Sequence, residues 1–204
     1  MHYDWCPKLI TWSGPNLWET VNNNISIVGS RRPYEGIYEW LDSEFTSFYN
    51  EHKNIIIVSG GARGVDQKAH SLALRSGRQT LCLLPTGLMR PYPAEIKRLE
   101  KHYKNTRSSI VSIFSPYEPI YKSHFYLRNR LIVGLSKATL VGSAAVRSGS
   151  MMTAKHAMDM GQDVLTLPGF PGQQGLDGNL QLINDGATMV RSSADLEAYW
   201  SLNK

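Results

Sequence analysis

Short turns rich in glycine, serine and arginine follow the apolar runs of this chain, and their composition suits the binding of phosphate. Glycine lets backbone N–H groups approach a ligand closely, and serine and arginine side chains donate hydrogen bonds to phosphate oxygens. A single turn of this kind is most often only a tight connection, but five of them favour a phosphate-binding edge. The five turns are Gly29-Ser30-Arg31-Arg32, Ser59-Gly60-Gly61-Ala62-Arg63-Gly64, Pro85-Thr86-Gly87, Gly142-Ser143 leading to Ser148-Gly149-Ser150, and Pro168-Gly169.

The same turns lack the signatures of several enzymes that handle phosphate. The sequence contains no G-x-x-x-x-G-K-[ST] run of a Walker-type ATPase, and no G-x-G-x-x-G with a ribose-binding acid downstream. It contains neither a G-x-S-x-G nucleophile motif nor the paired cysteines or clustered histidines of a metal site. We therefore expect a site that holds phosphate without breaking a bond, with no catalytic residues, no cofactor and no metal.

Three further residues could carry chemistry, but a structural role is the favoured interpretation for each. Asp66 and His70 lie four residues apart, which places them on one face of a predicted helix, where they can form a stabilising pair. Asp66 in the first turn also complements the helix dipole. Cys82 lies within an apolar run and is expected to be a small core residue.

A segment at 120–130 interleaves aromatic and basic side chains. Single-stranded nucleic acid is held by this combination, because cations follow the backbone while aromatic faces stack on bases. The other interpretation is that Phe125 and Leu127 anchor a helix in the core while the arginines lie on its exposed side. The local sequence leaves both open. The side chains concerned are Tyr121, His124, Phe125 and Tyr126 with Lys122, Arg128 and Arg130.

Positive charge is concentrated in one part of the chain. The 204 residues include 22 Lys and Arg against 17 Asp and Glu, which gives a net charge of +5. Six of these basic residues and no acidic residue lie at 119–158, which leaves 16 basic against 17 acidic residues elsewhere. A solvated basic face would explain the charge alone, but the concentration also suits a polyanionic partner.

The elements that must position these turns alternate along the chain. Continuous apolar runs predict strands that are covered on both faces, and helical spacing of apolar residues lies between them. The alternation predicts an α/β protein with a three-layer Rossmann-like fold and a largely parallel central sheet, in which ligands bind at the carboxyl ends of the strands. The predicted strands lie at 25–28, 55–58, 80–84, 110–114, 138–141 and 164–167, and a closing helix is expected at 194–202.

Length and composition set the wider expectations. We expect an extended lead-in segment at 1–24, with a short helix around Leu17, and one Rossmann-like domain at 25–204. The two cysteines suit a reducing compartment, no signal peptide is visible, and no apolar run approaches the ~20 residues of a membrane span. These features favour a cytoplasmic protein with no membrane partner.

Several motifs in fixed order resemble the DprA/Smf family of DNA-processing proteins, over about residues 24 to 195. The resemblance is specific because it rests on many short motifs rather than on one glycine-rich turn. The motifs are Ile27-Val28-Gly29-Ser30-Arg31, Val58 to Asp66 with Ala69-His70, Gly87 with Tyr92-Pro93-Ala94, His124-Phe125 with Arg128-Asn129-Arg130, Gly134-Leu135-Ser136, Ser148-Gly149-Ser150 with Thr153-Ala154, Pro168-Gly169, and Gly186-Ala187.

The resemblance implies a Rossmann-like domain that binds single-stranded DNA in a basic pocket, usually as a homodimer. It also implies a recombination mediator that helps to load the RecA recombinase during natural transformation, and not an enzyme. The spacing of Lys122 and Phe125 is similar to that of the family's phosphate-binding lysine and base-contacting aromatic. The nucleic-acid-binding residues that it implies are Gly29, Ser30, Arg31, Ser59, Gly60, Arg63, Lys122, Phe125, Arg128, Arg130, Ser148, Gly149 and Ser150.

The chain departs from the family pattern at Ser143, where a glutamate is common, at Gly61, where leucine is frequent, and at Ile113, where an acid is expected. Loss of the acid at Ser143 should favour polyanions in the pocket. The alternative function is that of a nucleotide-binding enzyme or sensor resembling the phosphoribohydrolases, whose signature is P-G-G-x-G-T-x-x-E. The corresponding stretch, Ser143 to Ala154, contains no acid, so this alternative ranks second.

Overall fold

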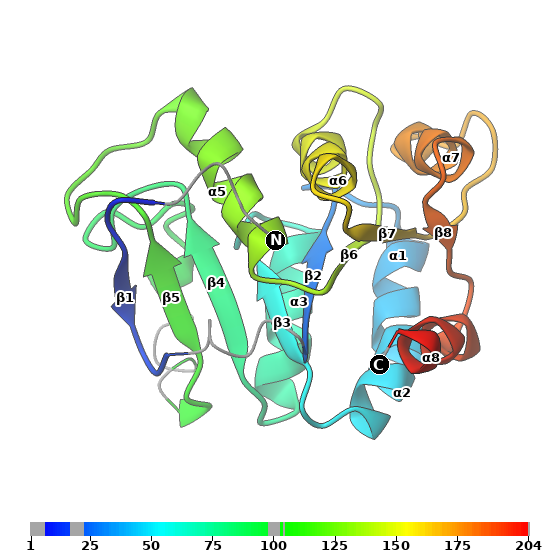
Figure 1. The fold of residues 1–204 in the computed structure, drawn as a ribbon, viewed down its shortest axis with the longest axis horizontal. Coiled ribbons are helices and arrows are strands. Elements are labelled where there is room, and N and C mark those ends of the chain that lie inside the picture. The colour runs from blue at the N-terminus through cyan, green and yellow to red at the C-terminus, as the bar shows by residue number, and fades with distance from the viewer. Residues whose placement is uncertain (1–6, 17–22, 98–102, 104, 204) are drawn as a thin grey trace.

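The computed structural model describes residues 7–16, 23–97, 103 and 105–203. Their strands form one eight-stranded sheet in the order β1-β5-β4-β3-β2-β6-β7-β8 (Figure 1). All neighbouring strands are parallel except β1 and β5, which confirms the predicted fold class. The strands are β1 (Thr11–Ser13), β2 (Asn24–Val28), β3 (Ile56–Ser59), β4 (Thr80–Leu84), β5 (Ser109–Ser112), β6 (Ala138–Val141), β7 (Asp163–Thr166) and β8 (Thr188–Met189).

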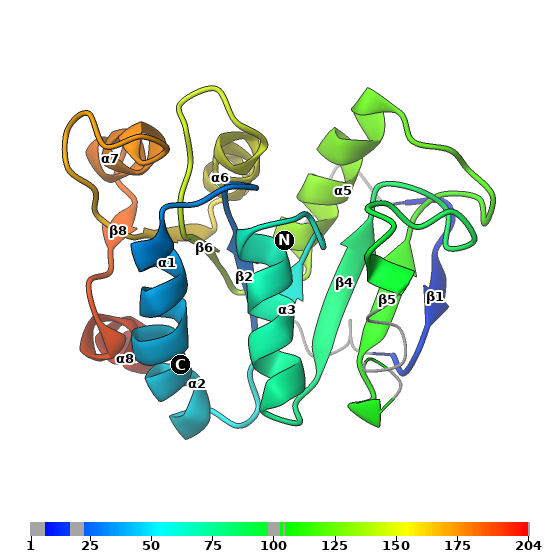
Figure 2. The same cartoon turned by 180° about the vertical axis from the view of Figure 1, so that it is seen from behind.

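Helices cover both faces of the sheet. Helices α1, α2 and α3 lie on one face (Figure 2), and α5 and α6 lie on the other (Figure 1). The closing helix α8 adds Leu196, Tyr199 and Trp200 to the core on the first face, and α7 adds Leu182 to the core on the second. The helices are α1 (Glu35–Trp40), the π-helical η2 (Leu41–Phe45), α2 (Thr46–Glu51), α3 (Val65–Arg75), α5 (Lys122–Gly134), α6 (Gly149–Asp159), α7 (Asp177–Asn184) and α8 (Ser193–Leu202).

Apolar side chains of the predicted helices form the core, as their spacing requires. The stripe of Ile37, Leu41, Phe45 and Phe48 is buried against Ile25 and the neighbouring strand residues. Because these positions recur every three to four residues, they stay on one side of the helical turns from α1 to α2. The run is therefore amphipathic in spite of the π-helical turn in its middle.

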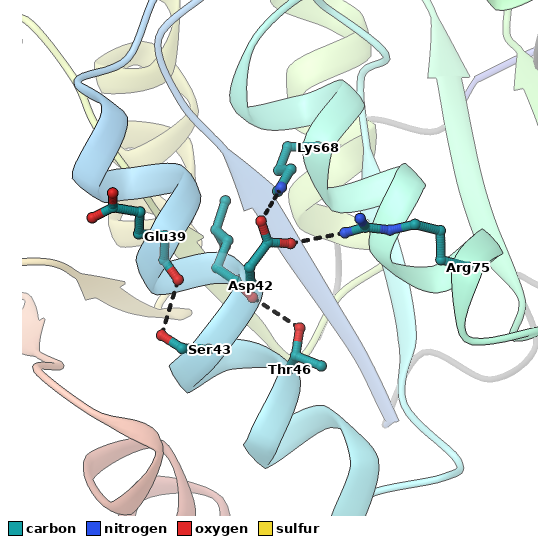
Figure 3. A network of polar contacts seen from close by, with 7 residues as sticks. Glu39, Asp42, Ser43, Thr46, Lys68 and Arg75 are labelled. Carbon is teal, nitrogen blue, oxygen red and sulfur yellow. Dashed lines mark hydrogen bonds and ion pairs between the residues drawn. The ribbon is translucent and has the colours of Figure 1, made fainter.

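A polar network joins this helical run to α3 (Figure 3). The carboxylate of Asp42 accepts hydrogen bonds from Lys68 and from Arg75, the latter at 2.8 Å from Nη2. Burial disfavours the ionised carboxyl, but the bonds from Lys68 and Arg75 outweigh it and lower the pKa of Asp42. Thr46 Oγ1 donates to the Leu41 carbonyl at 2.9 Å, inside the π-helical turn. The network fixes η2 against the helix whose first residue, Val65, lies close to the candidate site.

The register of the two central strands determines what meets at the sheet edge. β2 pairs with β6 so that Val28 lies opposite Val141, which brings Gly29 and Gly142 together where the strands end. β2 also pairs with β3, with Ser26 opposite Val58. Strands β3, β4 and β5 follow on one side of β2, whereas β6, β7 and β8 lie on the other. The ends of β2 and β6 therefore flank the topological switch point of the sheet.

The segment expected to be a lead-in contributes a strand to the sheet. β1 pairs antiparallel with β5, with Trp12 opposite Val111. The sequence did not predict this strand or the two-residue β8. The short helix expected around Leu17 lies outside the described residues, and a domain boundary at residue 24 stays a prediction. Among the residues that the structure describes, no helix is both long enough and apolar enough to span a membrane.

Candidate nucleic-acid interface

The switch point between β2 and β6 carries the first part of the site. The Ser30 N–H donates to the Ser143 carbonyl at 2.8 Å, and the Gly142 N–H donates to the Val28 carbonyl at 2.9 Å. Gly29 packs so closely on Val65 that an added Cβ would lie 2.5 Å from Val65 Cγ2. Only glycine therefore allows the end of β2 to approach the start of α3, and the loop is held from both sides.

A hollow of about 490 Å³ opens at this point, and we call it the switch-point hollow. Its polar side is formed by Gly29, Ser30 and Arg31 from the end of β2, Lys122 from α5, and Ser148-Gly149-Ser150 from the start of α6. Its apolar side includes Phe125, Tyr126 and Met152. One hollow thus offers hydrogen-bond donors and cations on one side and aromatic surface on the other.

The first turn of α6 lines this hollow with Ser148, Gly149 and Ser150. Ser148 is the N-cap, and its Oγ accepts a hydrogen bond from the Met151 N–H at 3.3 Å. The N–H groups of a first helical turn have no partner inside the helix, and the helix dipole adds partial positive charge there. The side chains of Arg31 and Lys122 are exposed beside it. The arrangement suits an anion such as a phosphate group.

A second hollow of about 510 Å³ lies beside the first, and we call it the lateral hollow. It is lined by Arg31, Arg32 and Arg63 on its polar side and by Tyr92 and Phe125 among its apolar residues. Arg31, Ala62, Phe125 and Arg128 line both hollows. The two hollows are therefore neighbours along the ends of the strands and share one wall.

Arg128 forms the buried part of that wall. Its Nη1 donates to the carbonyl of Gly60 at 2.5 Å and to that of Leu83 at 2.9 Å, so it joins the end of β3 to β4. Burial lowers the pKa of Arg128, while the nearby Asp66 opposes that shift. A Cβ at Gly60 would lie 1.8 Å from the Arg128 guanidinium, so this position requires glycine. Arg128 holds the loops of the site in place.

Asp66 is the buried counterpart of Arg128. Burial raises the pKa of Asp66 to about 6, opposed by Arg128 and by backbone N–H groups of Ala62, Gly29 and Gly60. The predicted pairing of Asp66 with His70 is wrong, because each has another partner. His70 Nδ1 lies 2.8 Å from Thr80 Oγ1, and burial lowers the pKa of His70 to about 3. The structural role expected for Asp66 therefore lies in holding two loops together.

Eleven of the thirteen predicted binding residues line one or both hollows. Ser59 and Arg130 line neither. Ser59 is fully buried, and its Oγ donates to the Ile27 carbonyl at 2.6 Å, so it joins β3 to β2 instead of facing a ligand. Arg130 lies further along α5, near His156, whose pKa is lowered by burial and then by Arg130. The residues that line a hollow are Gly29, Ser30, Arg31, Gly60, Arg63, Lys122, Phe125, Arg128, Ser148, Gly149 and Ser150.

One residue of the site, Glu95, and one residue that supports its loops, Asn179, were not expected from the sequence. Glu95 lines the lateral hollow and accepts a hydrogen bond from Arg63 Nε at 3.0 Å, with a second, shorter contact to Nη2. Asn179 accepts a hydrogen bond from the Ala144 N–H at 2.7 Å and donates to the Leu167 carbonyl at 3.0 Å. It joins the ends of β6 and β7. Glu95 directly follows the motif Tyr92-Pro93-Ala94, which could have indicated it. No motif near Asn179 indicates its role.

Few acidic groups enter the two hollows. Among their lining residues, Asp66 and Glu95 are the carboxylates. Ser143, where the family pattern has a glutamate, is buried, and its Oγ accepts a hydrogen bond from the Ser30 N–H at 3.3 Å. Within the described part of the chain, no three His, Cys, Asp or Glu side chains are grouped closely enough to hold a metal ion. The site is cationic at its surface.

Comparison with known proteins gives consistent matches. The model of the family described as DNA recombination-mediator protein A matches residues 2–200. DNA processing protein DprA of Streptococcus pneumoniae is 36% identical over 196 residues, which cover 96% of this chain and 67% of that protein. Protein Smf of Escherichia coli is 34% identical over 175 residues, which cover 84% of this chain and 46% of that protein. This chain therefore spans less than half the length of the Escherichia coli relative.

Two solved structures share the fold over nearly the whole chain. The crystal structure of DprA from Streptococcus pneumoniae superposes with a TM-score of 0.84 at 34% identity, covering 94% of this chain and 66% of that one. DprA from Helicobacter pylori superposes with a TM-score of 0.85 at 26% identity, covering 98% of this chain and 90% of that one. The Helicobacter pylori structure was described for its single-stranded DNA binding mode.

Proposed function

The chain belongs to the DNA recombination-mediator protein A family, the DprA/Smf proteins, and we propose that it binds single-stranded DNA in DNA processing. The observation that carries the proposal is the pair of hollows at the ends of the strands. There the exposed cations Arg31 and Lys122 stand beside the partly exposed ring of Phe125. A duplex hides the faces of its bases, so a site that combines cations with accessible aromatic rings favours an unpaired strand.

The binding residues follow from the two hollows. Arg31, Lys122 and the first turn of α6 hold phosphate groups, while Phe125 contacts a base. Arg63 supplies a further cation to the lateral hollow. Arg128 and Gly60 keep the loops in place beneath the strand, and Ser59 and Arg130 stand outside the contact surface. The binding is electrostatic in origin and independent of base sequence.

The role of the protein in the cell follows from its membership of the family. The protein acts in the cytoplasm as a recombination mediator that helps to load RecA on single-stranded DNA taken up in natural transformation, and it works as a homodimer. Light scattering of the purified chain measures the dimer. A RecA strand-exchange assay, with and without the protein, measures mediation. A monomer without effect on strand exchange would leave a DNA-binding protein and remove the mediator role.

The role is one of binding without catalysis. Asp66 is enclosed by backbone N–H groups, and Glu95 is bound to Arg63, so the carboxylates of the hollows already have partners. The stretch that carries the glutamate of the phosphoribohydrolase signature has no acid here. Incubation with nucleoside 5′-monophosphates tests this point by chromatography. Release of free base would establish the enzymatic alternative.

A titration with labelled oligonucleotides tests DNA binding directly. We expect single-stranded DNA to bind more tightly than duplex, with log affinity falling linearly as log salt rises, by about 0.7 per phosphate neutralised. Arg31→Ala or Lys122→Ala is expected to weaken binding to all sequences alike and to reduce that slope by roughly 0.7, which is one phosphate contact. Single-stranded RNA of the same length measures the preference for the sugar.

Arg130→Ala is the matched control, because it removes the same charge from α5 outside both hollows. We expect its affinity and salt slope to stay close to those of the parent protein. If Arg31→Ala and Lys122→Ala bind as tightly as the parent at low salt, the proposed site is wrong. If the parent does not bind single-stranded DNA at low salt, the proposed function is wrong.

A further inference from the structure

We propose that the two hollows hold the two bases of one dinucleotide step, splayed to either side of Phe125, and that Tyr126 and Tyr92 are the stacking residues of the two hollows. The inference rests on the proposed function and assigns two residues that the sequence analysis left outside the binding set. The phosphate between the two bases lies at Arg31.

The two hollows share a wall that contains both a cation and an aromatic ring. Arg31 and Phe125 are the shared residues that combine an exposed cation with an aromatic ring. Volumes of about 490 and 510 Å³ make each hollow large enough for a nucleoside. A strand that crosses the wall must place a phosphate on it, because two successive nucleosides are joined by one phosphate. Arg31 is the cation within reach of both sides.

Tyr126 lines the switch-point hollow and not the lateral hollow, and it adds an aromatic surface beside Phe125. Tyr126 is 43% exposed, so its ring is accessible to a ligand in this hollow. Its ring is nearly perpendicular to that of His156, at 81° with centroids 4.5 Å apart, so a buried neighbour holds it in place. Met152, also exposed, lines the same side. A base in this hollow would cover apolar surface that water now contacts.

Tyr92 plays the same part in the lateral hollow. It is 38% exposed, and its ring lies at 89° to that of Phe125 with centroids 6.1 Å apart. Pro85 and Pro93 line the same hollow and add apolar surface. Perpendicular rings form a corner in which a base can lie against one face and meet the edge of the other ring. Each hollow thus has a tyrosine fixed by a perpendicular ring.

The cations continue the path on both sides of the shared wall. Lys122 lines the switch-point hollow, and Arg32 and Arg63 line the lateral hollow. A strand that follows them meets a positive side chain before, at and after the central phosphate. Because both bases would leave the stack, duplex DNA cannot occupy the site in this way.

Binding of the dinucleotide d(TpT) and its two singly abasic analogues tests the assignment. We expect d(TpT) to bind at least ten times more tightly than thymidine 5′-monophosphate. Each stacking contact is expected to change affinity by roughly 5- to 150-fold. Tyr126→Ala is expected to weaken the binding of one abasic analogue and to leave the binding of the other unchanged. Tyr92→Ala is expected to show the opposite pattern. The pattern does not depend on the direction of the strand.

Two controls separate stacking from folding. Tyr126→Phe and Tyr92→Phe keep the ring and are expected to bind like the parent protein. Tyr117→Ala removes a 65% exposed ring that lines neither hollow and is expected to have no effect. If both abasic analogues respond alike to both alanine variants, or if the monophosphate binds as tightly as d(TpT), the inference is wrong. A decathymidylate that still binds through Lys122 would then leave the proposed function standing.

Discussion

The surface of the site and the layer beneath it both use arginine, but for different purposes. Arg31 is exposed and lines both hollows, whereas Arg128 lies under the same wall with its Nη1 hydrogen-bonded to two backbone carbonyls. The two residues are close enough for Arg31 to contribute, after burial, to lowering the pKa of Arg128. The partners of a cation, more than its place beside a groove, therefore decide whether it binds a ligand or holds the protein together.

Arg128→Ala tests whether Arg128 holds the loops of the site together. Arg128 is buried, and its Nη1 donates to two buried backbone carbonyls, so we expect its removal to cost about 3 to 5 kcal/mol. We expect the free energy of unfolding to fall by that amount, because the carbonyls of Gly60 and Leu83 lose their donor and Asp66 loses a nearby positive charge. Urea denaturation, followed by circular dichroism, measures the change.

Arg31→Ala is the matched control for stability. Its side chain is exposed, so we expect a change of less than about 0.5 kcal/mol in unfolding and a large change in DNA affinity. Arg128→Lys is also expected to destabilise, because an ammonium group cannot reproduce the planar geometry of the guanidinium. Equal stability of the parent and Arg128→Ala proteins would show that Arg128 does not hold the loops.

A second test concerns the pH dependence that Asp66 gives to the buried layer. Its pKa of about 6 in the folded protein lies above the usual 3.8, so the folded state holds the proton more tightly than the unfolded state. The destabilisation is therefore absent below about pH 4, grows as pH rises, and is complete above pH 6, where it reaches about 3 kcal/mol. In Asp66→Asn this dependence disappears.

Urea unfolding of the parent and Asp66→Asn proteins at pH 4 and pH 7 measures the effect. We expect the stability of the variant, relative to the parent, to rise by about 2 to 3 kcal/mol between the two pH values. Comparison of the two proteins at each pH cancels the titration of the other groups. A relative stability that is constant with pH would mean that the Asp66 carboxyl titrates alike in the folded and unfolded states.

The sequence was sufficient for the elements with strong local signals. Continuous apolar runs marked β2 to β7, and the stripe from Ile37 to Phe48 marked the helices that cover them. The strands β1 and β8 were missed because three- and two-residue strands have no periodicity of their own. β1 exists through its pairing with β5, which lies about 100 residues away.

The same limit applies to the site. Motif and spacing predicted Arg31, Lys122 and Phe125 as binding residues, and all three line the switch-point hollow. Turns that follow parallel strands meet at one edge of the sheet, which is why Arg31 lies there. The sequence did not indicate which way each side chain of a motif points. Ser59 ends β3 with its hydroxyl turned back to Ile27 inside the sheet, although the neighbouring Gly60 lines the lateral hollow. Asn179 bonds to residues 12 to 38 positions away, and only the folded chain brings them together.

Arg31 and Arg63 also differ from each other, although both line the lateral hollow. Arg63 differs from Arg31 because its guanidinium is bound to Glu95, a carboxylate on the lateral hollow. In Glu95→Gln this negative charge is lost, and we expect single-stranded DNA to bind about 2- to 5-fold more tightly at low salt, with the gain shrinking as salt rises. The ion pair has a 70% exposed arginine side chain, so unfolding is expected to change by less than about 1 kcal/mol.

Glu39→Gln is the control that separates an effect of the lateral hollow from an effect of net charge. Glu39 lies on α1, lines neither hollow, and its substitution changes the net charge of the chain by the same amount. A gain in affinity shared equally by the two variants would arise from net charge alone. A gain confined to Glu95→Gln, and lost again when Arg63→Ala is added, would mean that Glu95 restrains a cation that the strand otherwise uses. Arg63 would then stand between Arg31, exposed to the ligand, and Arg128, bound within the protein.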